Sequence, residues 1–137
     1  MCNALSRYFA NDLMVQDLEI KADDDLGKTI YGFGACSVEA NSEMVARASI
    51  SLNKNPSTTW TPAPMMNPIS GTSEPTWIFD TRPWGLVQID TRSNEREGRI
   101  QINEEHARTP SGRLSLTDEQ LRRVAEFCIG LTRYLRQ

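Results

Sequence analysis

The strongest constraint on the fold is an amphipathic segment at the C-terminal end of the sequence. Thr117 and Gln120 have the spacing of a helix-capping box, and Leu116 and Leu121 have the spacing of a hydrophobic staple. Apolar residues then recur at every third or fourth position as far as Leu135. Such a stripe has to be buried, so the pattern predicts one long helix that packs on a sheet.

Strands are predicted where apolar and polar residues alternate, since the side chains of a strand point to opposite faces of its sheet. The expected strands cover residues 18–22, 29–39, 44–52, 77–79, 86–89 and 99–103. Residues 3–13 have the spacing of a short helix. We therefore predict an α+β fold in a single domain, 1–137. It is an antiparallel β-meander sheet of about six strands with a short N-terminal helix and a long C-terminal α-helix.

An irregular stretch, 53–75, interrupts this pattern. It contains five of the seven prolines, which block both helices and central strands. We interpret it as a Pro-rich loop or arm, because a connection of this length in a compact domain is usually functional or mobile. Its apolar residues are candidates for contact with a partner protein, since Trp and Met are enriched at interfaces. They are Trp60, Met65, Met66 and Ile69.

The third quarter of the sequence combines aromatic and basic residues. The tripeptide Asp-Thr-Arg occurs at 80–82 and again at 90–92, and we interpret both copies as strand exits that lead into turns. Trp77 and Trp84 are further candidates for partner contact. With the arginines nearby they could form a stacking surface for bases or peptides. The arginines that could contact an anion or nucleic acid are Arg82, Arg92 and Arg99.

The charge balance does not favour a nucleic-acid reader. The net charge is −3, and the sequence lacks the dense basic stripe of such proteins. There is also no apolar run of the roughly 18 residues that a membrane helix requires, and no secretory signal pattern. We therefore expect a soluble protein in the cytoplasm of a cell or an infected host.

No catalytic, metal or cofactor motif is apparent. Three cysteines with no Cys-x-x-Cys spacing argue against zinc and against a disulfide framework, so Cys36 and Cys128 are predicted to be buried apolar residues. The single histidine, His106, has no metal-binding spacing. An enzyme would have to use Cys2, His106 or Asp80, for a reaction that the sequence does not identify.

These observations favour a non-catalytic protein-interaction or regulatory protein, binding another protein through its sheet face or the 53–75 loop. Because Phe127 and Ile129 widen the stripe of the C-terminal helix, we also expect a homodimer or larger homo-oligomer. In element order and acidity the chain resembles small dimeric secretion chaperones, which implies a chaperone-like role. A role like that of a phage or host inhibitor is a second form of the same binding function. The alternatives are a self-assembling subunit, such as a viral coat or accessory protein, and a nucleic-acid or small-ligand binder using the Arg/Trp sheet face.

Overall fold

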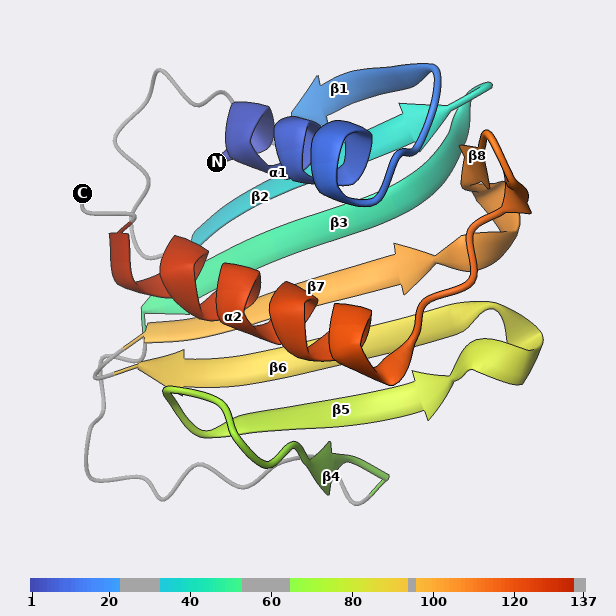
Figure 1. Ribbon diagram of the computed structural model, residues 1–137. Coiled ribbons are helices and arrows are strands. Elements are labelled where there is room, and N and C mark those ends of the chain that lie inside the picture. Colours follow the sequence, from blue (N-terminus) through green and yellow to red (C-terminus); the bar gives the residue numbers. More distant parts are fainter. Residues whose placement is uncertain (23–32, 53–64, 94–95, 135–137) are drawn as a thin grey trace.

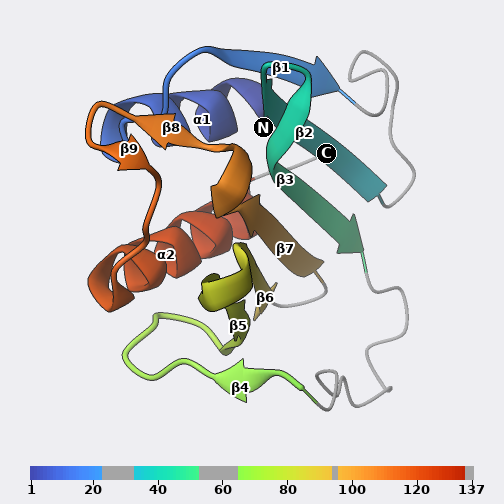
Figure 2. The ribbon, with the colours of Figure 1, turned by 90° about the vertical axis from the view of Figure 1, so that its right-hand side faces the viewer.

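A computed structural model describes residues 1–22, 33–52, 65–93 and 96–134. It is a two-layer α+β structure in which a seven-stranded antiparallel sheet carries its helices on one face (Figures 1 and 2). The sheet consists of β1 (Leu18–Ala22), β2 (Phe33–Ala40), β3 (Glu43–Leu52), β4 (Asn67–Pro68), β5 (Thr76–Thr81), β6 (Leu86–Ser93) and β7 (Arg96–Asn103). The helices are α1 (Cys2–Arg7) with a π-helical turn η1 (Tyr8–Asp12), two 3-10 turns, η2 (Arg82–Trp84) and η3 (Glu104–His106), and α2 (Asp118–Tyr134). A small hairpin of β8 (Arg108–Thr109) and β9 (Gly112–Arg113) precedes α2.

The predicted antiparallel sheet and both predicted helices are confirmed, but the strand order is not a simple meander. The order is β1-β2-β3-β7-β6-β5-β4, so two meanders meet where β3 pairs with β7. This central pairing is non-local, and no local sequence pattern specifies it. The start of the second expected strand, 29–32, lies outside the described residues.

The capping box of α2 forms as predicted. The Thr117 amide donates to the Gln120 side chain over 2.9 Å, and the Gln120 amide donates to the Thr117 hydroxyl over 3.1 Å. The helix packs on β6 and β7. It comes so close to β7 that the Thr132 hydroxyl occupies the space a side chain at Gly98 would need.

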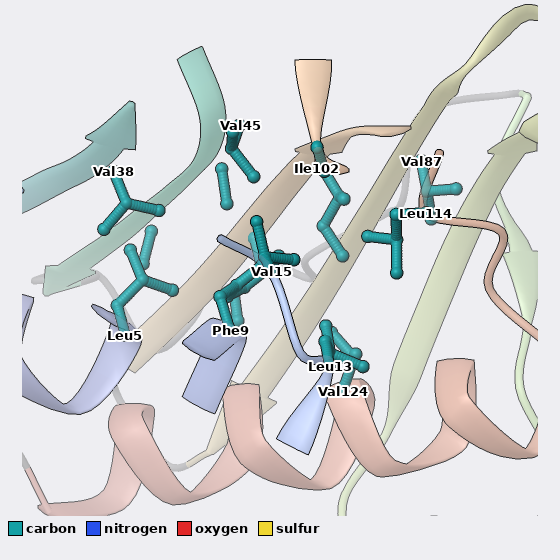
Figure 3. Packing of buried hydrophobic residues seen from close by; sticks show 14 of the residues in the cluster. Leu5, Phe9, Leu13, Val15, Val38, Val45, Val87, Ile102, Leu114 and Val124 are labelled. Carbon is teal, nitrogen blue, oxygen red and sulfur yellow. The ribbon is translucent and has the colours of Figure 1, made fainter. Parts of the chain in front are cut away.

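The core lies between the helices and the sheet (Figure 3). Leu5 and Phe9 of the N-terminal helical segment are fully buried against strand residues such as Val38 and Ile102. The wide stripe of α2 is also accounted for within the chain, because Ile129 is buried. Phe127 stacks on Tyr8 with ring centroids 4.3 Å apart. The width of the stripe therefore gives no support to a second subunit on this helix.

A disulfide joins Cys2 of α1 to Cys36 of β2, with Cα atoms 5.5 Å apart. The prediction that the cysteines form no disulfide was wrong, whereas the predicted burial of Cys36 is confirmed. The two cysteines are 34 positions apart and have no recognisable spacing. Only the docking of α1 on β2 brings them together. Cys128 is a buried free cysteine, as expected.

The described part of the irregular stretch packs against its own domain. Met66 is buried, and Ile69 packs against the core, whereas Met65 is exposed. The Ser73 amide and hydroxyl each donate to the Glu126 carboxylate on α2 over 2.7 Å. Residues 65–75 thus add the short edge strand β4 and then run along α2. Trp60 and the rest of 53–64 lie outside the described residues.

Candidate interaction surface

The sheet has one face covered by α1 and α2 and a second face turned away from them, which we call the far face (Figure 2). Alternation along β5 decides which side chains reach it. Ile78 packs against the core, so its neighbours Trp77 and Phe79 project from the far face. Leu86 on β6 lies on the same face, because the next residue, Val87, is fully buried in the core. Trp77 and Phe79 are half-buried, and Leu86 is 38% exposed.

These three side chains form an apolar strip along β5 and the start of β6. The register places Trp77 opposite Asp90 and Phe79 opposite Gln88. Pro68 of β4 lies on the outer side of Trp77. The strip therefore borders a polar row on one side and a short edge strand on the other. An apolar patch with a polar border is the usual anatomy of a protein-binding surface.

A hydrogen-bonded network holds the polar row in place. Arg99 donates to both carboxylate oxygens of Asp90, over 2.8 and 2.9 Å. The Gln88 amide donates to Asp90 over 3.3 Å, and the Gln101 amide donates to Gln88 over 3.0 Å. Hydrogen bonding to Asp90 raises the pKa of Arg99, although burial opposes the shift. Asp90 lies in the middle of β6. The predicted second strand exit at 90–92 was therefore wrong.

The β5–β6 turn presents the most exposed aromatic side chain among the described residues, Trp84, at 81% exposure. Gly85 closes this turn with a φ of 85°, a conformation that favours glycine. The Gly85 carbonyl accepts a 2.7 Å hydrogen bond from the Glu104 amide, which ties the turn to the end of β7. The chain therefore displays Trp84 on a supported backbone.

Arg82 anchors the other side of the turn. Its guanidinium donates to Asp80 over 2.9 Å, to Asp118 of α2 over 2.8 Å, and to the Leu116 carbonyl over 3.0 Å. The hydrogen bond to Asp80 contributes most to raising the pKa of Arg82. For Asp80 itself, burial alone would raise the pKa, but the hydrogen bonds and charge of Arg82 outweigh it and lower the pKa below its ordinary value. Arg82 is thus a structural anchor on the helix side of the sheet.

The structure brings together only some of the residues singled out from the sequence. Trp77, Arg92 and Arg99 share the far face, and Arg92 lies opposite Glu97 in the register. Trp84 is at the tip of the neighbouring turn, and Arg82 faces α2. Since carboxylates accompany these arginines, the far face is not the continuous basic surface of a nucleic-acid reader.

Sequence reasoning missed a shallow groove between η1 and α2. Its volume is about 580 Å³. It is lined by Tyr8, Asp12, Leu13, Glu119, Gln120, Arg122, Arg123 and Glu126. Burial is the main reason that the pKa of Tyr8 rises to about 12. The lining carries charges of both signs, so no single ligand chemistry follows from it.

Each residue considered for catalysis already has a partner. The Cys2 sulfur is bonded to Cys36, and Asp80 is paired with Arg82. His106 lies with Nε2 3.2 Å from a Glu43 carboxylate oxygen. Among the residues that the structure describes, no three His, Cys, Asp or Glu side chains gather as a metal site would require.

Comparison with known proteins adds no further assignment: no family model, curated protein or solved structure matches the chain. Within the described parts of the chain, no helix has the length and apolar character needed to span a membrane.

Proposed function

We propose that this is a non-catalytic protein that binds another protein through the far face of its sheet and the adjoining Trp84 turn. The observation that carries the proposal is the apolar strip of Trp77, Phe79 and Leu86 beside a hydrogen-bonded polar row. Interfaces depend on a few buried aromatic and arginine anchors surrounded by polar contacts. Trp84 supplies a protruding anchor at the end of this strip.

A rigid presentation of these side chains favours binding. Side chains that are already ordered lose less conformational entropy when a partner covers them. Arg82 and Gly85 fix the turn, and Asp90 fixes Arg99. A regulatory or chaperone-like role would use such a surface, and the identity of the partner decides between the two.

Two other functions were considered from the sequence, and each makes a different prediction. A nucleic-acid binder would show affinity that falls steeply with salt, because phosphate contacts release counterions. A self-assembling subunit would form large particles without any partner. The pairing of Arg99 with Asp90 and of Arg82 with Asp80 leaves the nucleic-acid function with less support than a protein partner.

The cellular location stays a prediction. Disulfides persist in oxidising compartments and are rare in the cytosol. The Cys2–Cys36 bond therefore favours oxidising surroundings over the cytoplasm that was expected from the sequence.

The proposal is tested by quantitative affinity capture from the source cells. The bait carries Trp84→Ala, Phe79→Ala or, as a matched control, Met14→Ala, which removes an exposed apolar side chain outside the far face. We expect the same captured protein with the wild type and the Met14 variant, and at least about tenfold less with the other two, since an anchor residue contributes about 2 kcal/mol. Capture that is unchanged in both far-face variants would contradict the proposal, as would steeply salt-dependent binding of a single-stranded oligonucleotide by the wild type.

A further inference from the structure

Among the strands that the structure describes, β1 forms one end of the sheet. This strand is outermost in the strand order and pairs only with β2 among the described strands (Figure 1). The outward-facing backbone groups of an edge strand are a ready template for another strand. At the centre of β1, Ile20 is 46% exposed although its register partner on β2, Val38, is fully buried. The edge therefore offers both backbone hydrogen bonds and apolar surface.

The charges on β1 are arranged for pairing with an identical strand. Glu19 and Lys21 flank Ile20, and both are exposed. If a second β1 runs antiparallel with the two Ile20 residues opposite each other, Glu19 lies opposite Lys21 of the second copy, twice over. Opposite charges across neighbouring strands attract, and like charges repel. The edge is self-complementary in this register, as a two-fold symmetric contact requires.

The neighbouring strand adds a reason for Glu19 to accept a cation. Glu19 lies directly opposite Glu39 on β2, which is an unfavourable pair of like charges. Lys21 of the same chain is 3.5 Å from Glu39 and so offsets only part of this repulsion. In the paired register, Lys21 of the second copy would lie on the other side of Glu19 and give it a neighbour of opposite charge.

We propose that two copies of this chain join edge to edge through β1, antiparallel and centred on Ile20, so that their sheets become continuous. The contact lies at the β1 end of the sheet, whereas Trp77 and Phe79 lie on β5 toward the other end, so it stands independently of the function proposed above. A homo-oligomer was expected from the wide apolar stripe of α2. The proposed contact places the self-association on β1 instead.

Light scattering after size-exclusion chromatography, over a series of concentrations, tests the proposal with a charge reversal. Glu19→Lys creates two repulsive lysine contacts across the axis, and it places a lysine opposite Glu39 within the chain. The fold should therefore be as stable as the wild type or more so. The dissociation constant of the dimer should rise by about tenfold or more, because two attractive pairs become repulsive.

Three complementary measurements keep the interpretation specific. Lys21→Glu alone should also weaken the dimer. An equimolar mixture of the Glu19→Lys and Lys21→Glu chains should form heterodimers, because each strand then carries one sign of charge. The double variant, which swaps the two charges, should restore the wild-type dissociation constant.

A wild type that stays monomeric at high micromolar concentration would overturn the proposal. So would a dimer whose dissociation constant is unchanged by Glu19→Lys, since that dimer would use another surface. Capture of a partner protein through the strip on β5 and β6 should be the same for Glu19→Lys and the wild type, because β1 lies at the other end of the sheet. Failure of the edge contact and failure of the proposed function are therefore distinguished.

Discussion

At the scale of single residues, charged side chains on the two faces of the sheet have different roles. Arg82 connects β5 to the start of α2, whereas Arg99 stays on the far face and is oriented by Asp90. The sequence alone does not separate these roles, because the partners that distinguish them, Asp118 for Arg82 and Asp90 for Arg99, are not adjacent along the chain. The face of the sheet on which each side chain lies decides its role. Alternation along β5 and β6 gives that face once a single buried residue, such as Val87, is known.

Replacing Arg82 by alanine should destabilise the protein. It should also make the free energy of unfolding depend less on acid pH. The variant loses the bonds to Asp80, Asp118 and the Leu116 carbonyl, and we expect the free energy of unfolding to fall by about 1 kcal/mol, since the ion pairs are partly exposed.

The pH dependence follows from the lowered pKa of Asp80. A carboxyl whose folded pKa is below its unfolded value contributes stability above the unfolded pKa and loses it as the pH falls through the folded pKa. The wild type should therefore lose this contribution below about pH 4. Chemical denaturation at pH 7 and at pH 3 measures both effects. An equal stability difference between the wild type and Arg82→Ala at the two pH values would contradict the assignment.

At the scale of elements, the packing of α2 on β7 depends on one glycine. Gly98→Ala would place a methyl group where the Thr132 hydroxyl lies, and we expect a loss of about 1–3 kcal/mol from overpacking. Gly130 in α2 is the matched control, because a methyl group there meets open space. Gly130→Ala should therefore stabilise the protein by about 0.5–1 kcal/mol through helix propensity.

Thermal unfolding of the two glycine variants checks the prediction. The midpoint should fall for Gly98→Ala and rise for Gly130→Ala. If Gly98→Ala unfolded at the wild-type temperature, the close contact between α2 and β7 would be wrong.

The elements that were predictable from sequence are those set by local chemistry. The Thr117–Gln120 capping box fixes the start of α2, and alternation along residues 44–52 identifies β3. The pairing of β3 with β7 and the meeting of Cys2 with Cys36 depend on contacts between distant segments. For the same reason, Trp77 and Arg99 were predicted as site residues, but the row that joins them through Asp90 was not.

At the scale of the whole molecule, one covalent bond links the N-terminal helix to the sheet. Closing a loop between positions 34 apart should stabilise the fold by about 3–4 kcal/mol, because the unfolded chain loses conformational freedom. We expect Cys36→Ser or a dithiol reductant to lower the unfolding midpoint clearly. Differential scanning calorimetry with and without reductant measures this change, and an identical midpoint would contradict a structural role for the bond.

Thiol alkylation followed by mass spectrometry counts the cysteines that are not in a disulfide. Cys128 is buried, and burial is the main cause that raises its pKa to about 12, so the folded protein should not be labelled. One label is expected after denaturation and three after denaturation with reduction. Three labels after denaturation alone would show that the disulfide is absent.

The most direct test of the proposed function is site-specific photocrosslinking in the source cells. A photoreactive amino acid replaces Phe79 on the far face or, as a control, Arg122 on the opposite side of the molecule, where it lines the groove of α2. The proposal predicts one discrete crosslinked protein from position 79 and none of the same mass from position 122. The same product from both positions, or from position 122 alone, would contradict binding through the far face.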